Sequence, residues 1–197
     1  HGLVRNDATV FPQAIALAAS WDTSLVSQVA NAIADEAAVR GIRQILSPVI
    51  NLATDPRWGR TEETYGEDPF LTSAMGDAFM GAFERKNIIT TPKHFIANVG
   101  AGGKDSYPIH DNERLFSETH FRPIVSAFKN AAARSVMTSY NSVNGSPASA
   151  NDWLLNKTLK DKWGFRGFVI SDASAVGGAT VLHNTAKEYA ESRTQAI

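Results

Sequence analysis

The stretch Gly167–Asp172 (GFVISD) decides the fold that we expect for this chain. Its run of apolar and β-branched residues follows a glycine and predicts a short strand that is buried on both faces. The run stops at Ser171 and Asp172, which places a carboxylate at the carboxyl end of the strand. Ligands bind at that end of the strands in α/β barrels and doubly wound sheets. Asp172 is therefore a candidate functional residue, and the alternative is that it caps the following segment or pairs with a nearby cation.

Outward from this stretch, short apolar runs alternate with amphipathic segments along the chain. Further strands are predicted at Ile45–Leu52, Ile88–Thr91 and Ser135–Ser139. Helices are predicted to begin after or near the capping residues Asp22, Asp68, Asn112 and Asn151, and a last helix is predicted over Thr185–Ile197. Pro123 is expected to break or restart the helix that begins near Asn112. This alternation of strand and helix predicts a parallel sheet with crossover helices.

Polar residues of an unusual kind follow the carboxyl end of each predicted strand. In chain order they are Arg57 and Arg60, then Lys93 and His94, then Tyr140 and Asn141, and finally Asp172. The carboxyl ends of successive parallel strands meet on one face of a barrel or along one edge of an open sheet, so we expect these side chains to converge. A complete barrel has about 250 residues, more than this chain of 197. The predicted fold class is therefore α/β, as an incomplete TIM-type (β/α)8 barrel.

The composition is that of an ordinary globular domain, and it argues against several classes of binding partner. With 43% hydrophobic and 20% charged residues, the chain is expected to form one domain around one core. A formal net charge of -1 without a basic run argues against nucleic acid or an anionic membrane as the main partner. No apolar stretch has the length that a membrane span requires. The histidines lack ligand-like spacing and no glycine pattern opens a helix after a strand, so we expect no metal and no cofactor.

The chain contains no cysteine, which excludes disulfides and thiolate chemistry. That absence fits the cytoplasm and the bacterial periplasm alike. The sequence opens at His1 and not at Met, so we expect the true N-terminus and any targeting segment to lie upstream. The location is therefore not determined, although a periplasmic or secreted one is favoured over a cytoplasmic one.

A carboxylate among Arg, Lys, His and Tyr side chains suits a sugar ligand. Hydroxyl-rich ligands need charge-assisted hydrogen bonds, which cations donate and carboxylates accept. Cations close to Asp172 would hold it ionised at neutral pH, as a nucleophile on an anomeric carbon requires. Glycoside hydrolysis with retention needs a second carboxyl group about 5 Å away to protonate the leaving oxygen. Spacing singles out none of the candidates, which are Glu62, Glu63, Glu67, Asp105 and Asp111.

The cationic candidates also have structural interpretations. Arg57 and Arg60 could simply neutralise the acidic loop that follows them, because ion pairs are common in loops. His94 could be a hydrogen-bonded residue of the core. Lys93 is harder to explain as structure, since a lysine at the end of a buried strand must still reach water or an anion.

The aromatic candidates have alternatives as well. Tyr140 could pack against its neighbours instead of contacting a ligand. Trp58 could stack on a sugar or seal the polar loop in which it lies. Trp153 and Trp163 fall on a helical pattern and are expected to belong to the core.

The chain carries a series of short motifs, in this order: Phe11–Gln13 (FPQ), Asp55–Arg60 (DPRWGR), Tyr65–Pro69 (YGEDP), Lys93–Phe95 (KHF), Met137–Asn141 (MTSYN) and Trp163–Asp172 (WGFRGFVISD). Together they strongly resemble glycoside hydrolase family 3. The similarity is to the N-terminal barrel domain of the β-glucosidase and β-xylosidase branch, and it covers almost the whole chain at closely matching spacing.

This resemblance implies a function and a set of site residues. The implied activity is a retaining exo-β-glycosidase that acts on a small oligosaccharide or an aryl or alkyl β-glycoside, in carbohydrate catabolism. Asp172 is implied as the catalytic nucleophile, and the implied hydrogen-bond donors to the sugar in the first subsite are Arg60, Lys93 and His94. The implied lining of that subsite is Met137 and Tyr140, with Lys104 at a position where relatives often carry Arg.

The chain also departs from the family pattern. Ala173 stands where relatives frequently have Trp directly after the nucleophile. An acidic residue that binds sugar in the family would lie upstream of His1, and the family's acid/base Glu comes from a following domain. Residues 1–197 are therefore expected to form a single partial barrel domain, without the start of the barrel and without its C-terminal partner domain.

Two other functions stay open at this point. The N-acetylglucosaminidase branch of the family continues its Lys-His motif with Gly-His-Gly, whereas here Phe95 is followed by Ile96–Asn98 (IAN), so that branch ranks second. A non-catalytic carbohydrate-binding relative is the alternative from another class, and Ala173 gives it some support. For residues 1–197 alone we expect exposed apolar surface where missing strands would close the barrel, and hence aggregation.

Overall fold

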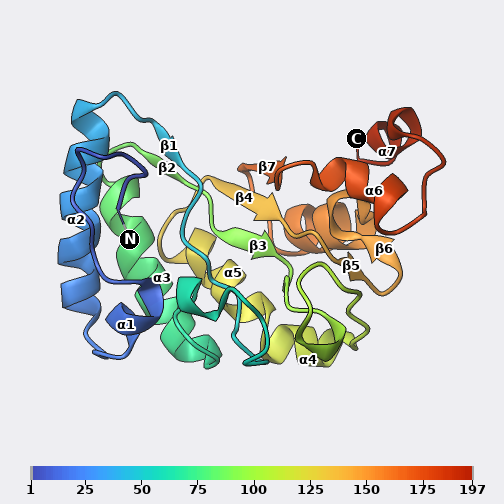
Figure 1. Cartoon of the computed structure of the whole chain (residues 1–197), viewed down its shortest axis with the longest axis horizontal. Helices are drawn as coiled ribbons and strands as arrows, with labels where there is room; N and C mark the ends of the chain where they lie inside the picture. The colour runs from blue at the N-terminus through green and yellow to red at the C-terminus, as the bar shows by residue number, and fades with distance from the viewer. Residues whose placement is uncertain (1, 197) are drawn as a thin grey trace.

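The computed structural model describes residues 2–196 and has a mixed α/β architecture. Strands cross the middle of the molecule, with α2 (Thr23–Val39) and α3 (Pro69–Glu84) at one end and α6 (Gly178–Val181) and α7 (Tyr189–Gln195) at the other (Figure 1). The other helices are α1 (Ala14–Ala18), α4 (Glu113–Glu118), α5 (Phe121–Lys129) and the π-helix Trp153–Lys162. The predicted end of the last helix at Ile197 lies outside the described residues.

The parallel strands lie side by side in the order in which they occur in the chain. β1 (Gln44–Ile45) pairs with β2 (Ile89–Thr90), while β3 (Lys93–Phe95) pairs with β4 (Ser135–Thr138), which pairs with β7 (Phe168–Ser171). Ile50 N donates to Lys93 O at 2.8 Å and Met137 N donates to Pro92 O at 3.1 Å, so β2 and β3 are successive parts of one run between β1 and β4. The predicted parallel sheet is confirmed, and its carboxyl ends face one way.

The strands differ from the prediction in length and in exposure. β1 ends at Ile45, because the rest of the predicted strand keeps only an isolated parallel bridge at Val49. Lys93 and His94 lie inside β3 rather than after a strand. The prediction that β7 is buried on both faces is wrong, since Phe168 is 41% exposed. Among the described strands β7 pairs only with β4, so it is an edge strand of this sheet.

One small sheet was not predicted. β5 (Ser142–Val143) and β6 (Ser146–Pro147) form a short antiparallel hairpin in the connection after β4. Asn144 and Gly145 make its turn, both with positive φ (50° and 89°). Positive φ at both central residues is typical of a two-residue hairpin turn with an Asn-Gly sequence.

The predicted helix starts are confirmed by side-chain caps. The side-chain oxygen of each predicted cap accepts a hydrogen bond from the backbone N–H three residues on, at 3.0 Å for Asp22, 2.6 Å for Asp68, 2.9 Å for Asn112 and 3.1 Å for Asn151. Each bond satisfies an N–H group that a helix leaves unpaired at its start. Pro123 lies in the first turn of α5, where proline is tolerated, so the interruption falls just before α5 and not at Pro123 itself.

Aromatic side chains hold the helices against the sheet. Phe121 of α5 meets Trp163 edge-on with ring centroids 4.7 Å apart, and Trp163 lies 6.0 Å from Phe95 of β3. Trp153 packs 6.2 Å from Phe116 of α4 in the same cluster. Aromatic pairs in such geometries stabilise a core beyond the area that they bury. The predicted core positions of Trp153 and Trp163 are thereby confirmed.

No helix among residues 2–196 combines the length and the apolar composition that crossing a bilayer needs.

Candidate active site

The side chains that were predicted to converge come together around Asp172, at the carboxyl end of β7. The Asp172 side chain is 14% exposed, and its Oδ2 lies 3.3 Å from Nε2 of His94, which comes from β3. Ala173 N donates to Asp172 Oδ1 at 2.7 Å. Tyr140, which follows β4, is close enough to the same carboxylate for the two groups to shift each other's pKa. Three strand ends therefore contribute to one site.

Arg60 reaches this group from the segment after β1. Its Nε and Nη2 donate to the two carboxylate oxygens of Glu63 at 2.7 and 3.0 Å, and Nη2 also lies 3.1 Å from Nε2 of His94. A bidentate pair of this kind fixes the plane of the guanidinium group. Arg57, in contrast, has a side chain that is 69% exposed, and it pairs at 2.6 Å with Asp55, which precedes it, and not with the acidic loop that follows.

Asn51 holds His94 in place through the backbone and the ring together. Asn51 Oδ1 lies 2.8 Å from the backbone N of His94 and 2.7 Å from its ring Nδ1, and Asn51 Nδ2 donates to His94 O at 2.8 Å. Both residues are buried, at 5% and 0% exposure. Buried polar groups that are fully paired in this way restrict a side chain to one orientation.

The environment of Asp172 keeps its carboxylate ionised. Burial alone raises the pKa of Asp172, but the neighbouring His94 ring, the N–H of Ala173 and Tyr140 outweigh that effect and together lower the pKa to about 2. Burial also raises the pKa of Tyr140, and the charge of Asp172 adds to that shift, so the phenol stays protonated as a donor. The site thus presents an anionic oxygen at any pH near neutrality.

The two basic residues of the Lys-His motif respond to the same surroundings. Burial lowers the pKa of Lys93, and the negative charge of Asp172 partly offsets that shift. Burial likewise lowers the pKa of His94, with Arg60 and Lys93 acting in the same direction and Asp172 against it. His94 is therefore a neutral imidazole at pH 7.

The resemblance implies two further site residues, Met137 and Lys104. Met137 is 3% exposed in β4, in register with Lys93 on one side and Ile170 on the other, so it shares a face of the sheet with them. Lys104 is exposed and directly follows the turn Ala101–Gly103. Their proposed contacts with a sugar stay predictions.

Asp105 links the loops that border the site. Its Oδ1 accepts hydrogen bonds from Trp58 Nε1 and from Asn98 Nδ2, both at 2.9 Å. Its charge also acts on Arg60 and Tyr140. Trp58 is only 2% exposed, so it seals its loop and is not a stacking platform for a sugar. The role of Asn51 was not predicted, although a polar residue inside the apolar run Ile45–Leu52 is a signal that points to it. The pairing of Arg60 with Glu63 matches the structural interpretation of Arg60, in which it neutralises the acidic loop that follows.

The remaining carboxylates do not identify an acid/base partner for Asp172. Glu62 and Glu67 are exposed, and Glu63 is engaged by Arg60. Among residues 2–196 there is also no group of histidine, aspartate and glutamate side chains arranged to hold a metal ion.

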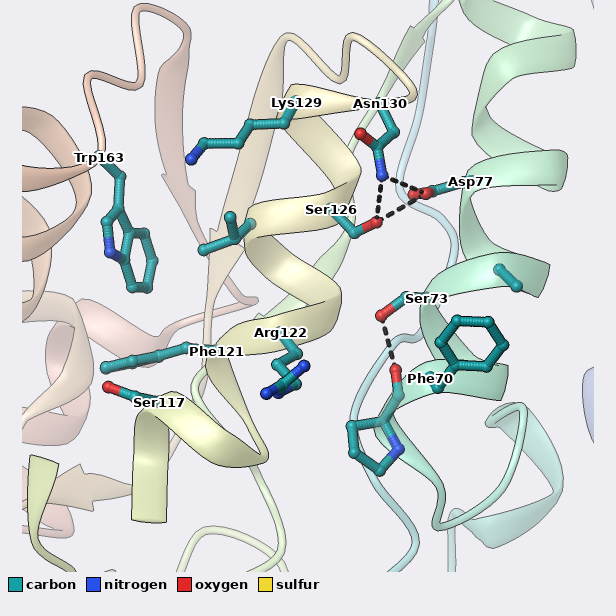
Figure 2. A pocket seen from close by; sticks show the side chains of 13 residues that line it. Phe70, Ser73, Asp77, Ser117, Phe121, Arg122, Ser126, Lys129, Asn130 and Trp163 are labelled. Carbon is teal, nitrogen blue, oxygen red and sulfur yellow. Dashed lines mark hydrogen bonds between the residues drawn. The ribbon is translucent and has the colours of Figure 1, made fainter. Parts of the chain in front are cut away.

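One cavity among the described residues lies away from the strand ends. It has a volume of about 540 Å³ and lies between α3 and α5 on the helical side of the molecule (Figure 2). Its lining includes Phe70, Asp77, Arg122 and Trp163, and Ser126 of α5 donates to Asp77 at 2.6 Å across it. The carboxyl ends of the strands, where Asp172 lies, are the better candidate for chemistry because charged groups from separate strands meet there.

Comparisons with known proteins agree with this arrangement. The model of the glycosyl hydrolase family 3 N terminal domain matches residues 1–196. The chain belongs to glycosyl hydrolase family 3. Among its relatives within family 3, a periplasmic beta-glucosidase of Salmonella typhimurium is 36% identical over 196 residues, which are 95% of this chain and 25% of that protein. A beta-xylosidase of Formosa agariphila is 37% identical over 205 residues, or 96% of this chain and 27% of that protein.

The structural comparison supports the same fold. A β-glucosidase of Erythrobacter marinus superposes with a TM-score of 0.96 at 36% identity, covering 100% of this chain and 27% of that one. The predicted TIM-type α/β fold of a family 3 N-terminal domain is therefore confirmed. The chain spans about a quarter of the length of the relatives that it matches.

Proposed function

We propose that the complete protein is a retaining exo-β-glycosidase that releases terminal β-D-glucosyl or xylosyl residues from small oligosaccharides or aryl and alkyl β-glycosides. The observation that carries this proposal is the ionised, largely buried carboxylate of Asp172 between His94 and Tyr140, with Arg60 close by. The names of the relatives, beta-glucosidase and beta-xylosidase, support the same class of substrate.

In the proposed mechanism Asp172 acts as the nucleophile. Its Oδ attacks the anomeric carbon while the bond from that carbon to the leaving oxygen breaks, and a glutamic acid outside this chain protonates the leaving oxygen. The glutamate then removes a proton from water, which attacks the anomeric carbon and releases the sugar and Asp172. The tyrosine and the cations around Asp172 hold the sugar hydroxyls, with Arg60 and Lys93 as donors, and Met137 and Lys104 complete the proposed sugar contacts.

We propose in addition that residues 1–197 are one partial barrel domain of that protein. The acid/base glutamate would come from a C-terminal domain that packs on the strand ends. Two observations support this division: the chain spans about a quarter of its relatives, and of the candidate carboxylates Glu62 and Glu67 are exposed while Glu63 is engaged by Arg60.

The test is covalent labelling of the complete protein with activated 2-deoxy-2-fluoro glucosides and xylosides. Peptide mass spectrometry then locates the adduct. A fluoroglycosyl group on Asp172 is the expected result, and the faster sugar indicates the preferred substrate. A folded protein that forms no adduct with either sugar would contradict the proposal and favour the N-acetylglucosaminidase or the non-catalytic alternative.

A further inference from the structure

We infer that Asn51 is a positioning residue which holds His94 as the Nδ1–H tautomer, so that Nε2 is a hydrogen-bond acceptor inside the site at neutral pH. The inference rests on the proposed function only for its effect on turnover. The tautomer itself follows from the contacts between the two side chains.

The orientation of the Asn51 amide is determined by the backbone of His94. The backbone N–H of His94 can only donate, so the atom 2.8 Å away is the amide oxygen, and the carbonyl of His94 can only accept, so the atom 2.8 Å away is the amide nitrogen. Turning the amide over would place two donors together at one contact and two acceptors at the other. The oxygen that faces the ring is thereby fixed as Oδ1.

That oxygen then determines the proton on the ring. Asn51 Oδ1 lies 2.7 Å from Nδ1 of His94 and has no proton to donate, so Nδ1 carries the hydrogen. In a neutral imidazole the other nitrogen, Nε2, has a lone pair. Arg60 Nη2, at 3.1 Å, can only donate, and it fits a lone pair at Nε2.

Nε2 cannot accept a hydrogen bond from Arg60 and donate one to Asp172 at the same time. A neutral His94 accepts from Arg60 and faces Oδ2 of Asp172, at 3.3 Å, without a proton between them. A cationic His94 carries a proton on Nε2 and donates a hydrogen bond to Asp172. It then has no lone pair to accept a hydrogen bond from Arg60. At neutral pH the acceptor form leaves Asp172 free of an imidazolium partner and engages Nε2 with Arg60, which is the reverse of the donor role that the family resemblance implies.

The charged groups that face His94 come from each element packed against it. They are Asp172 after β7, Arg60 and Glu63 from the segment after β1, and Lys93 on the same strand. Of these, the two cations oppose protonation of the ring and the carboxylates favour it. Asn51 is uncharged, so it selects the tautomer without an added charge that would favour or oppose protonation of the ring.

The direct test is the ¹⁵N spectrum of the imidazole in the complete protein, labelled at histidine, with His94 assigned by the signal that His94→Gln removes. A neutral ring with the proton on Nδ1 near pH 7 is expected. A neutral ring with the proton on Nε2, or a cationic ring at that pH, would overturn the inference whatever the activity of the protein.

Asn51→Asp tests the positioning role. A carboxylate beside Nδ1 stabilises the imidazolium, so the pKa of His94 should rise by about 1–3 units, and the acid limb of kcat/KM should move to higher pH with it. A matched control is Asn151→Asp, because Asn151 is a buried amide that accepts from Leu154 N and donates to Val143 O, both at 3.1 Å. The control should leave the titration of His94 unchanged.

The outcomes separate this inference from the proposed function. The Nδ1–H tautomer in a protein without glycosidase activity would support the inference and contradict the function. An active enzyme whose His94 titrates identically in the wild type and in Asn51→Asp would contradict the inference and leave the function intact. If Asn51→Asp fails to fold, the wild-type spectrum still decides the tautomer.

Discussion

Replacing Glu63 by Gln tests whether a fixed Arg60 matters for the site. The two hydrogen bonds from Arg60 to Glu63, at 2.7 and 3.0 Å, hold the guanidinium beside His94. Glutamine keeps the shape of the side chain but has one carbonyl oxygen and no charge, so it can accept only one of the two bonds well. Arg60 is then free to rotate away from the position where we expect it to meet the sugar.

The size of the effect follows from the exposure of the pair. A hydrogen bond to a charged group contributes about 1.5–3 kcal/mol, but the side chain of Glu63 is 36% exposed and solvent screens part of that. A loss of about 1–2 kcal/mol remains. Since about 1.4 kcal/mol corresponds to a factor of ten, kcat/KM should fall about 5–30-fold in Glu63→Gln.

The assay is the steady-state hydrolysis of an aryl β-glycoside by the complete protein across a range of pH. Burial raises the pKa of Glu63, but the hydrogen bonds and charge of Arg60 outweigh it, so the pKa is lowered overall and Glu63 is ionised at neutral pH. The difference between wild type and variant should therefore be complete at neutral pH and should shrink as the pH falls through the lowered pKa of Glu63.

The control for this prediction is Glu118→Gln on the exposed helix α4. Glu118 accepts a hydrogen bond from Arg114 at 2.8 Å, so this is also an arginine–glutamate ion pair, but both of its side chains are largely exposed. That variant should retain wild-type kinetics. If Glu63→Gln also retains them, the reasoning that ties Arg60 to the sugar through Glu63 is refuted.

Three more predictions follow from the fold and the site. Asp172→Asn in the complete protein should lower kcat by about 10⁴-fold or more while sugar binding, measured by calorimetry, persists; near-normal turnover would remove the nucleophile assignment. Phe121→Ala should cost about 3–5 kcal/mol of stability because it empties the centre of the aromatic cluster, and an unchanged unfolding midpoint would contradict that view of the core. Residues 1–197 expressed alone should aggregate and show little hydrolysis, whereas a monodisperse, fully active preparation by light scattering would contradict the partial-domain proposal.

Features that depend on local chemistry were predicted well from the sequence. The caps at Asp22, Asp68 and Asn151 were found because a short polar side chain before an apolar pattern has few other uses. The convergence of His94, Tyr140 and Asp172 was found because parallel strands carry their carboxyl ends to one face.

Features that depend on tertiary pairing were missed. The burial of β7 was predicted wrongly because an apolar run has the same pattern in the middle of a sheet as at its edge. The short extent of β1 was missed because apolar residues also line irregular backbone in a core. Asn51 was not recognised because its partner, His94, lies 43 residues further along the chain and is identified only by distance in the folded chain.

Neighbouring strands of this sheet are also successive in the chain, so each strand with its following loop contributes its own residue to the site. The segment after β1 delivers Arg60, β3 delivers His94, the segment after β4 delivers Tyr140, and β7 delivers Asp172, each from its own strand and following loop. One such unit can therefore be exchanged for that of a relative without changing the register of the others. Recombination between glucosidase and xylosidase sequences at the helices would alter one wall of the proposed sugar pocket at a time and, where the β7 unit is kept, would leave the proposed nucleophile in place.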